Sequence, residues 1–198
     1  MCGIVGYVGS QQAAPLLLDG LRRLEYRGYD SAGIATLSNG RFTVLRSSGK
    51  LENLIAKVGG VPPPGSTGIG HTRWATHGRP TESNAHPHAD CSGSVVAVHN
   101  GIFENFAERK AALEASGHRF TSETDTEVFA HEVEAAYRGD IFGAVRAAFR
   151  QLSGAYAVVV SSSSEPGVIV AARSGPPIVI GLGQGENFVA SDPVALVP

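Results

Sequence analysis

The spacing of hydrophobic positions changes from one segment of the chain to the next, and these changes predict its elements. Residues 2–8 form an apolar run with β-branched side chains, which is typical of a buried strand. Leucines recur at helical spacing between residues 11 and 25, so this stretch predicts a helix. Two apolar stretches, 31–37 and 42–46, flank a Ser-Asn-Gly segment, which is a strong signal for a β-hairpin.

The rest of the chain continues as a mixture of strands and helices. By the same criteria we expect strands over 68–74, 94–99, 155–161, 167–172, 178–180 and 188–190, and helices over 51–58, 106–116, 126–137 and 141–152. Residues 75–93 form a polar loop much longer than the usual connection of about 4–6 residues, and such loops are often functional. Strands and helices do not alternate strictly, so the order favours an α+β fold, with helical layers on two largely antiparallel sheets.

Composition narrows the classes of function. The 198 residues suffice for one domain with its own core, and the net charge of −2 gives no reason to expect a nucleic acid or an acidic membrane as partner. No apolar run reaches the roughly 20 residues of a membrane span, and no secretion signal is visible. Two cysteines do not make a disulfide framework, so we expect a cytoplasmic protein.

Cys2 is a candidate nucleophile because it follows the initiator methionine. Removal of that methionine, which is usual before a small residue, would leave the Cys2 thiol beside its own α-amino group. An α-amino group has a pKa of about 7.7–8.0, which suits a general base. On position alone, a small buried residue at the start of a strand remains the more frequent explanation of Cys2.

Three further positions offer polar groups that could serve such a nucleophile. Arg73 ends a predicted strand, and its planar fork of donors suits a carboxylate, although a surface ion pair is the commoner role of an arginine. Asn100-Gly101 follows another strand and makes either a simple turn or the two donors of an oxyanion hole. Asp125 precedes a helix, where it or Thr124 would cap the helix, and its carboxylate would also suit a substrate ammonium.

The histidines of the long loop and its flanks predict no metal site. They are close in sequence to one another and to a cysteine, but their spacing matches no zinc pattern: His71, His77, His86, His88 and Cys91. The glycines at 181, 183 and 185 precede a predicted strand, whereas a dinucleotide site requires a helix there.

Six motifs, taken together and in order, resemble one family. They are Cys2-Gly-Ile-Val-Gly6, residues 22–33, His71-Thr-Arg-Trp-Ala-Thr-His-Gly78, residues 84–88, Val98-His-Asn-Gly101 and residues 122–127. In these motifs the chain is similar to the N-terminal glutaminase domains of glucosamine-6-phosphate synthases, the isomerizing glutamine–fructose-6-phosphate aminotransferases, which are class II glutamine amidotransferases. The resemblance implies the N-terminal-nucleophile hydrolase fold, a four-layer αββα sandwich.

The resemblance also implies a reaction and its residues. The thiolate of Cys2 would attack the side-chain amide of L-glutamine and form a thioester that water hydrolyses to glutamate. Its own amino group would be the base, acting through a water in the family. Asn100 and the backbone of Gly101 would form the oxyanion hole. Arg73 would hold the α-carboxylate of glutamine, and Asp125 its α-ammonium. No metal and no organic cofactor would be needed.

Four further residues receive roles from the resemblance alone. Thr76 and His77 would lie in a mobile loop that encloses glutamine. Trp74 would gate the passage of ammonia, and Arg27 would lie near the nucleophile.

The family's domain continues past the position of residue 198, and two sugar-isomerase domains follow it. Residues 2–198 are therefore expected to be a glutaminase domain truncated at its C-terminal end, whose partners are those domains and whose ammonia serves glucosamine 6-phosphate synthesis from fructose 6-phosphate. A sheet edge left exposed would permit association into a homo-oligomer. A glutaminase that serves another acceptor and a silent glutamine-binding fragment stay open as alternatives.

Overall fold

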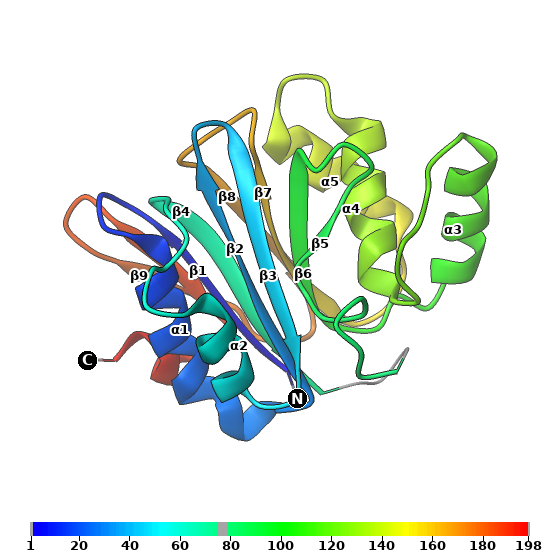
Figure 1. Cartoon of the computed structure of the whole chain (residues 1–198). Helices are drawn as coiled ribbons and strands as arrows, with labels where there is room; N and C mark the ends of the chain where they lie inside the picture. Colours follow the sequence, from blue (N-terminus) through cyan, green and yellow to red (C-terminus); the bar gives the residue numbers. More distant parts are fainter. Residues whose placement is uncertain (1, 75–78, 198) are drawn as a thin grey trace.

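The computed structural model describes residues 2–74 and 79–197, which contain two antiparallel sheets (Figure 1). The first sheet has the order β3-β2-β4-β1-β10-β9, and the second has the order β5-β6-β7-β8. The strands of the first sheet are β1 (Gly3–Val8), β2 (Ser31–Ser38), β3 (Arg41–Ser48), β4 (Thr67–Arg73), β9 (Val179–Leu182) and β10 (Asn187–Ala190). Those of the second sheet are β5 (His88–Ala89), β6 (Val95–Gly101), β7 (Tyr156–Ser162) and β8 (Ile169–Ser174).

Helices cover the outer face of each sheet, so the layers follow the order αββα (Figure 1). The helices are α1 (Ala13–Leu24), α2 (Leu51–Val58), α3 (Phe106–Ala115), α4 (Asp125–Ala136) and α5 (Ile141–Gln151), with short 3₁₀ turns at Glu25–Arg27 and Pro193–Leu196. Helices α1 and α2 pack on the first sheet, and α3, α4 and α5 lie on the side of the second. The expected α+β sandwich is confirmed. Within the described residues, no helix has the length and apolar character needed to cross a membrane.

The alternation of side chains along the strands builds the cores between these layers. In β1, Ile4 belongs to the core between the two sheets, whereas Val5 and Tyr7 belong to the core under α1 and α2. Strand β6 alternates in the same way. Val96 and Val98 face the other sheet, whereas Val95 and Ala97 face the helices. Side chains in phase with Ile4 and Val98 therefore point into the gap between the sheets.

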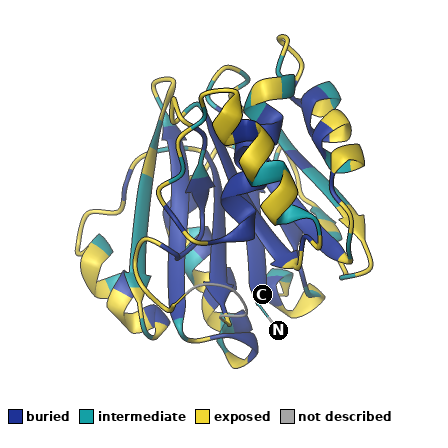
Figure 2. Cartoon of the chain, turned by 90° about the vertical axis from the view of Figure 1, so that its right-hand side faces the viewer, coloured by how far each residue is buried: buried dark blue, intermediate teal, exposed yellow. Residues whose placement is uncertain are grey.

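Two features of the fold differ from the sequence prediction. Strand β5 lies inside the long predicted loop over 75–93, where two residues are too few to show any periodicity, and it pairs with β6. Helix α4 is buried from Asp125 to Val133, on all its sides, because it contacts the second sheet and both α3 and α5 (Figure 2). Polar side chains of α4 are therefore held inside the protein.

The predicted hairpin is confirmed. Strands β2 and β3 pair from Ser38 and Arg41 onward, and the two residues between them have positive φ angles of 51° at Asn39 and 72° at Gly40. Asparagine and glycine are the residues that adopt this conformation most readily, which explains why this pair marks the turn.

Candidate active site

A cavity of about 370 Å³ opens where β1, β4 and β6 meet the start of α4. Its size falls in the range of about 300–1,000 Å³ that is usual for small-molecule sites. It is lined by seven of the residues that the sequence singled out: Cys2, Arg27, Arg73, Trp74, Asn100, Gly101 and Asp125. Cys2, Arg73 and Asn100 meet because each is in phase with the side chains that face the gap between the sheets. Thr76 and His77 lie outside the described residues.

Cys2 lies directly before β1, with its sulfur against the backbone of Trp74. The Trp74 backbone nitrogen donates to Sγ at 3.2 Å, and Sγ lies 3.6 Å from the Trp74 carbonyl oxygen. Burial raises the pKa of the Cys2 thiol above its ordinary value, so the thiol form prevails at neutral pH. A reaction at this sulfur therefore requires a group that accepts its proton.

Asn100 is held in one orientation by two hydrogen bonds. Its Nδ2 donates to the carbonyl oxygen of Cys2 at 3.1 Å, and its Oδ1 lies 3.0 Å from Nε2 of His71. That Nε2 also lies 3.0 Å from the carbonyl oxygen of His99. Both of its neighbours are acceptors, so Nε2 of His71 carries the proton and donates. The amide nitrogen of Asn100 consequently faces Cys2.

His71 is chemically suited to hold that amide. It is fully buried in β4, and burial lowers the pKa of His71 to about 3, so the ring is neutral at pH 7. Sequence reasoning considered His71 only as a metal ligand. The signal that could have found its position is its spacing of two residues from both Ile69 and Arg73, which places all three on one face of the strand.

Gly101 is required by its backbone conformation. It has a φ of 119°, and a Cβ atom at this position would lie 2.2 Å from the carbonyl oxygen of Ala155. Asn100 and Gly101 are still paired with β7, opposite Ala157 and Tyr156, so the simple turn is excluded as the explanation of this pair. Strand β6 instead carries both residues to the wall of the cavity.

Arg73 and Asp125 place opposite charges at the same cavity. Arg73 is only 4 % exposed, which excludes the surface ion pair, and its Nη1 donates to the carbonyl oxygen of Arg79 at 3.4 Å. Asp125 is 6 % exposed, and its Oδ2 accepts from the backbone nitrogen of Phe103 at 3.0 Å. Asp125 is the first residue of α4, where the helix dipole favours a negative charge.

The expected side-chain cap of α4 is wrong. Thr124 is the N-cap residue but forms no capping bond with its side chain. Its hydroxyl instead lies 2.9 Å from Nε2 of His88 and 2.9 Å from the hydroxyl of Ser122. The first turn of α4 is thus held by contacts with β5, and Asp125 is directed at the cavity rather than at its own helix.

Arg27 and Trp74 complete the wall from the first sheet. Arg27 is buried, and its Nη1 donates to Oδ2 of Asp192 at 2.9 Å and to the carbonyl oxygen of Ser191 at 3.2 Å. Trp74 is 49 % exposed and makes an edge contact with Tyr29, with ring centroids 5.3 Å apart. Arg27 therefore lines the same cavity as Cys2 and ties that cavity to the segment after β10.

Three further histidines lie at this cavity, and sequence reasoning assigned none of them a role in the reaction: His86 and His99 line the cavity, and His88 packs against His86. The ring of His86 stacks on that of His71 at 4.2 Å and meets that of His88 edge-on at 4.9 Å. Burial lowers the pKa of His86 well below its ordinary value and that of His88 to about 3. His99 stacks on Phe103 at 4.0 Å. The rings of His86 and His88 are therefore neutral at pH 7, and those of His86 and His99 line the cavity beside Asn100 and Asp125.

Comparison with known proteins connects this geometry to a family. A sequence profile described as "Glutamine amidotransferase domain" matches residues 71–198. The whole chain is 60 % identical over 198 residues to glutamine–fructose-6-phosphate aminotransferase [isomerizing] of Thermus thermophilus, and 56 % identical to that of Symbiobacterium thermophilum. It covers 33 % and 32 % of these proteins, so the chain spans about a third of the length of the curated relatives that it matches.

Solved structures show the same fold. The glutamine phosphoribosylpyrophosphate amidotransferase of B. subtilis, complexed with ADP and GMP, superposes with a TM-score of 0.85 at 28 % identity, over 98 % of this chain and 43 % of that chain. A class-II glutamine aminotransferase domain protein from Silicibacter pomeroyi superposes with a TM-score of 0.64 at 19 % identity, over 96 % of this chain and 88 % of that one. The second likeness concerns the fold alone.

Proposed function

The chain belongs to the glutamine amidotransferase domain family, and on this basis we propose that it hydrolyses the side-chain amide of L-glutamine to glutamate and ammonia. One observation carries the proposal: a partly buried thiol, an oriented amide, one cation and one anion line the same cavity, at Cys2, Asn100, Arg73 and Asp125. An α-amino acid carries one negative and one positive group, and these two charges match Arg73 and Asp125.

Glutamine would be held by its α-carboxylate and its α-ammonium, so that its side-chain amide is free to reach the Cys2 thiol. The fork of donors on Arg73 suits the α-carboxylate, and the Asp125 carboxylate suits the α-ammonium. Both charged groups are buried, so their interactions with a ligand are screened little by water. We assign Thr76 and His77 to the segment that encloses the ligand, on the basis of the family resemblance.

The chemical steps use groups close to the sulfur. After loss of Met1, the α-amino group of Cys2 would take the thiol proton, and the thiolate would attack the carbonyl carbon of the glutamine amide. The oxygen of the tetrahedral intermediate would be held by Nδ2 of Asn100, which has two hydrogens, and by the backbone N–H of Gly101. Collapse with proton transfer to nitrogen expels ammonia and leaves a thioester. Water then cleaves the thioester, which releases glutamate and restores the thiol.

We propose that the ammonia serves amino-sugar synthesis in a longer protein. The curated relatives at 50–60 % identity are named isomerizing glutamine–fructose-6-phosphate aminotransferases, and the chain matches about a third of each. The acceptor would be fructose 6-phosphate bound to sugar-isomerase domains, and Trp74, half-exposed at the cavity, would control the passage of ammonia towards them.

A glutaminase assay on protein of known N-terminal mass tests the proposal. Molecules that have lost Met1 should release glutamate, and a glutamine analogue with an electrophilic diazoketone should add once, at Cys2. Molecules that retain Met1 should do neither, and glutamine should protect Cys2 from the analogue. Glutamate release at full rate by protein that retains Met1 would contradict the role of the amino group. Glutamine binding without any turnover by Met1-free protein would favour the silent fragment.

Arg73→Lys should weaken the binding of glutamine. A lysine has a point charge in place of the planar fork, so the paired contact with the α-carboxylate is lost. Charged hydrogen bonds contribute about 1.5–3 kcal/mol, so we expect Kd or KM to rise about 10- to 100-fold with a smaller change in kcat. Arg150→Lys, at the exposed end of α5, is the matched control and should leave both constants unchanged. An unchanged KM in Arg73→Lys would refute this assignment.

His71→Ala should reduce kcat through Asn100. Without the donor at Nε2, the Asn100 amide keeps only its bond to the Cys2 carbonyl oxygen and is held less firmly in direction. Loss of one oxyanion donor costs about 10²–10³-fold in kcat. We expect a fall of this order for Asn100→Ala, a somewhat smaller fall for His71→Ala, and little change in KM for either. In the Asn100→Ala background, His71→Ala should cost nothing further, because it acts through the same group. Additive losses in the double variant would show that His71 acts elsewhere.

A further inference from the structure

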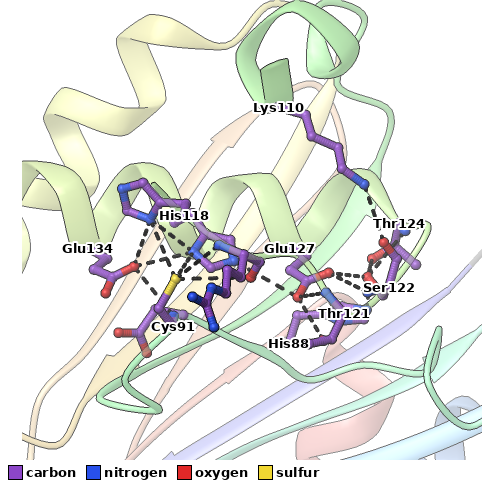
Figure 3. A network of polar contacts seen from close by, with 12 residues as sticks. His88, Cys91, Lys110, His118, Thr121, Ser122, Thr124, Glu127 and Glu134 are labelled. Carbon is purple, nitrogen blue, oxygen red and sulfur yellow. Dashed lines mark hydrogen bonds and ion pairs between the residues drawn. The ribbon is translucent and has the colours of Figure 1, made fainter. Parts of the chain in front are cut away.

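A second cluster of reactive side chains lies away from the cavity, and we propose that it binds a zinc ion. The cluster consists of Cys91, His118, His131 and Glu134. Cys91 follows β5, His118 lies in the connection between α3 and α4, and His131 and Glu134 lie one turn apart on α4. In Figure 3, Cys91, His118 and Glu134 point towards one another from these separate segments.

Five of the six distances between the four donor atoms lie near those of a tetrahedral site, and all four atoms lie within 4.8 Å of one another. Nδ1 of His118 lies 3.2 Å from Nδ1 of His131, and Sγ of Cys91 lies 3.8 and 3.6 Å from these two nitrogens. Oε2 of Glu134 lies 3.0 and 3.2 Å from the same nitrogens. With bond lengths of about 2.3 Å to sulfur and 2.0–2.2 Å to nitrogen and oxygen, a tetrahedral zinc ion separates its ligand atoms by about 3.3–3.6 Å.

An ion at the centre explains this arrangement better than hydrogen bonds do. The two ring nitrogens face each other and also share one carboxylate oxygen. If both Nδ1 atoms carried protons, the two hydrogens would be directed at the same small space. If only one Nδ1 carried a proton, the lone pair of the other ring and the carboxylate oxygen of Glu134 would compete for that single hydrogen. A dication accepts the lone pairs of both rings, the carboxylate and a thiolate at once.

Further contacts hold two of the donor groups from behind. The second nitrogen of His131, Nε2, faces Oε1 of Glu127 at 3.9 Å, which places a carboxylate behind this ring although beyond hydrogen-bonding distance. Glu127 in turn accepts from the backbone nitrogens of Thr121 and Ser122 at 2.8 and 2.7 Å (Figure 3). The sulfur of Cys91 accepts from the backbone nitrogen of Arg119 at 3.4 Å, a contact that suits a thiolate.

The donor types select zinc and a structural role. Magnesium and calcium take oxygen ligands, whereas a thiolate with two imidazoles suits zinc. Four protein ligands leave no open position, which is typical of structural rather than catalytic zinc. The ion would join the segment after β5 and the connection after α3 to α4, the helix whose first residue is Asp125. No spacing in the sequence shows this site, because its ligands come from three separate segments.

Metal content tests the proposal directly. Protein purified without a histidine tag and dialysed against metal-free buffer should bind one zinc ion per chain when zinc is returned. With cobalt(II) in its place, we expect intense visible bands of tetrahedral cobalt and a sulfur-to-cobalt charge-transfer band. Cys91→Ser should lose the charge-transfer band, and His118→Ala should lose stoichiometric binding. Cys2→Ser changes the only other cysteine of the chain and should keep the band.

Thermal unfolding supplies a second readout. At free zinc of about 100 times Kd, the Tm of the wild type should rise by about 5–10 °C, and Cys91→Ser should show no such rise. Circular dichroism of each variant without metal checks that it is folded. Absence of zinc binding by the folded wild type, binding that survives in both Cys91→Ser and His118→Ala, or a band that depends on Cys2 would overturn the proposal. Glutamate release enters none of these measurements, so the two proposals fail independently.

Discussion

Cys2→Ala should abolish the release of glutamate while glutamine binding stays measurable. The substitution removes the thiol that would form the thioester, and removal of a covalent nucleophile can reduce kcat by about 10⁴-fold or more. The groups proposed to hold the amino acid, Arg73 and Asp125, lie on β4 and α4 and keep their own hydrogen bonds. Glutamate production and calorimetric titration with glutamine measure the two effects separately.

Cys2→Ala should remove the thiol without changing the processing of the N-terminus or the shape of the cavity. Alanine is also small, so removal of Met1 should proceed as in the wild type, and intact mass checks this. The Cys2 thiol makes only local contacts with the Trp74 backbone, so its loss should leave the cavity assembled. If Cys2→Ala turned over glutamine like the wild type, the assignment of Cys2 as the nucleophile would be wrong. Loss of glutamine binding together with turnover would show that the variant is misfolded.

Mild acid should destabilise the protein steeply between pH 6.5 and 4. His71 and His88 have pKa values of about 3 in the fold because burial disfavours their charged forms, against about 6.5 when unfolded. Between these values the unfolded chain binds protons that the folded chain does not. The stability they contribute is therefore complete above pH 6.5 and is lost as pH falls. The slope is about 1.4 kcal/mol per pH unit for each histidine.

Other groups modify this slope in known directions. His86 adds to it, because burial lowers its pKa well below the ordinary value. Burial lowers the pKa of His131, but the carboxylates of Glu127 and Glu134 raise it overall, so its contribution is complete below pH 6.5 and is lost only as pH rises above that value. The pKa of Glu127 is about 2 despite its burial, since His131 lies 3.9 Å away and Ser122 and Thr121 donate hydrogen bonds to the carboxylate. Its contribution is lost only below pH 4.5.

Urea unfolding at pH 7, 6 and 5 in the presence of a chelator measures the effect. We expect the free energy of unfolding to fall by about 3 kcal/mol between pH 6 and 5, a large part of the 5–15 kcal/mol that is usual for a domain. His88→Asn should reduce the slope by about one proton, provided that the variant is folded at pH 7. A stability that is flat from pH 7 to 5 would show that these histidines bind protons inside the fold.

Local pattern predicted most of the architecture. Continuous apolar runs and leucine spacing located nearly every strand and helix, because burial of one or both faces of an element imposes its period on the sequence. The hairpin at Asn39-Gly40 followed from backbone preference alone. Strand β5 was missed, because two residues have no period, and the complete burial of α4 was missed, because it depends on what surrounds the helix.

The residue types and their order in the sequence determined the two sheets, the candidate nucleophile and the charges suited to an amino acid. Each of these features depends on local spacing or on a short motif. Only the tertiary structure decided which side chains meet. Strand phase brings Cys2, Arg73 and Asn100 into one gap, and a neutral His71 turns the Asn100 amide towards Cys2. The cluster from Cys91 to Glu134 likewise depends on three segments that pack together. Such contacts join residues far apart in the chain, and no local periodicity records them.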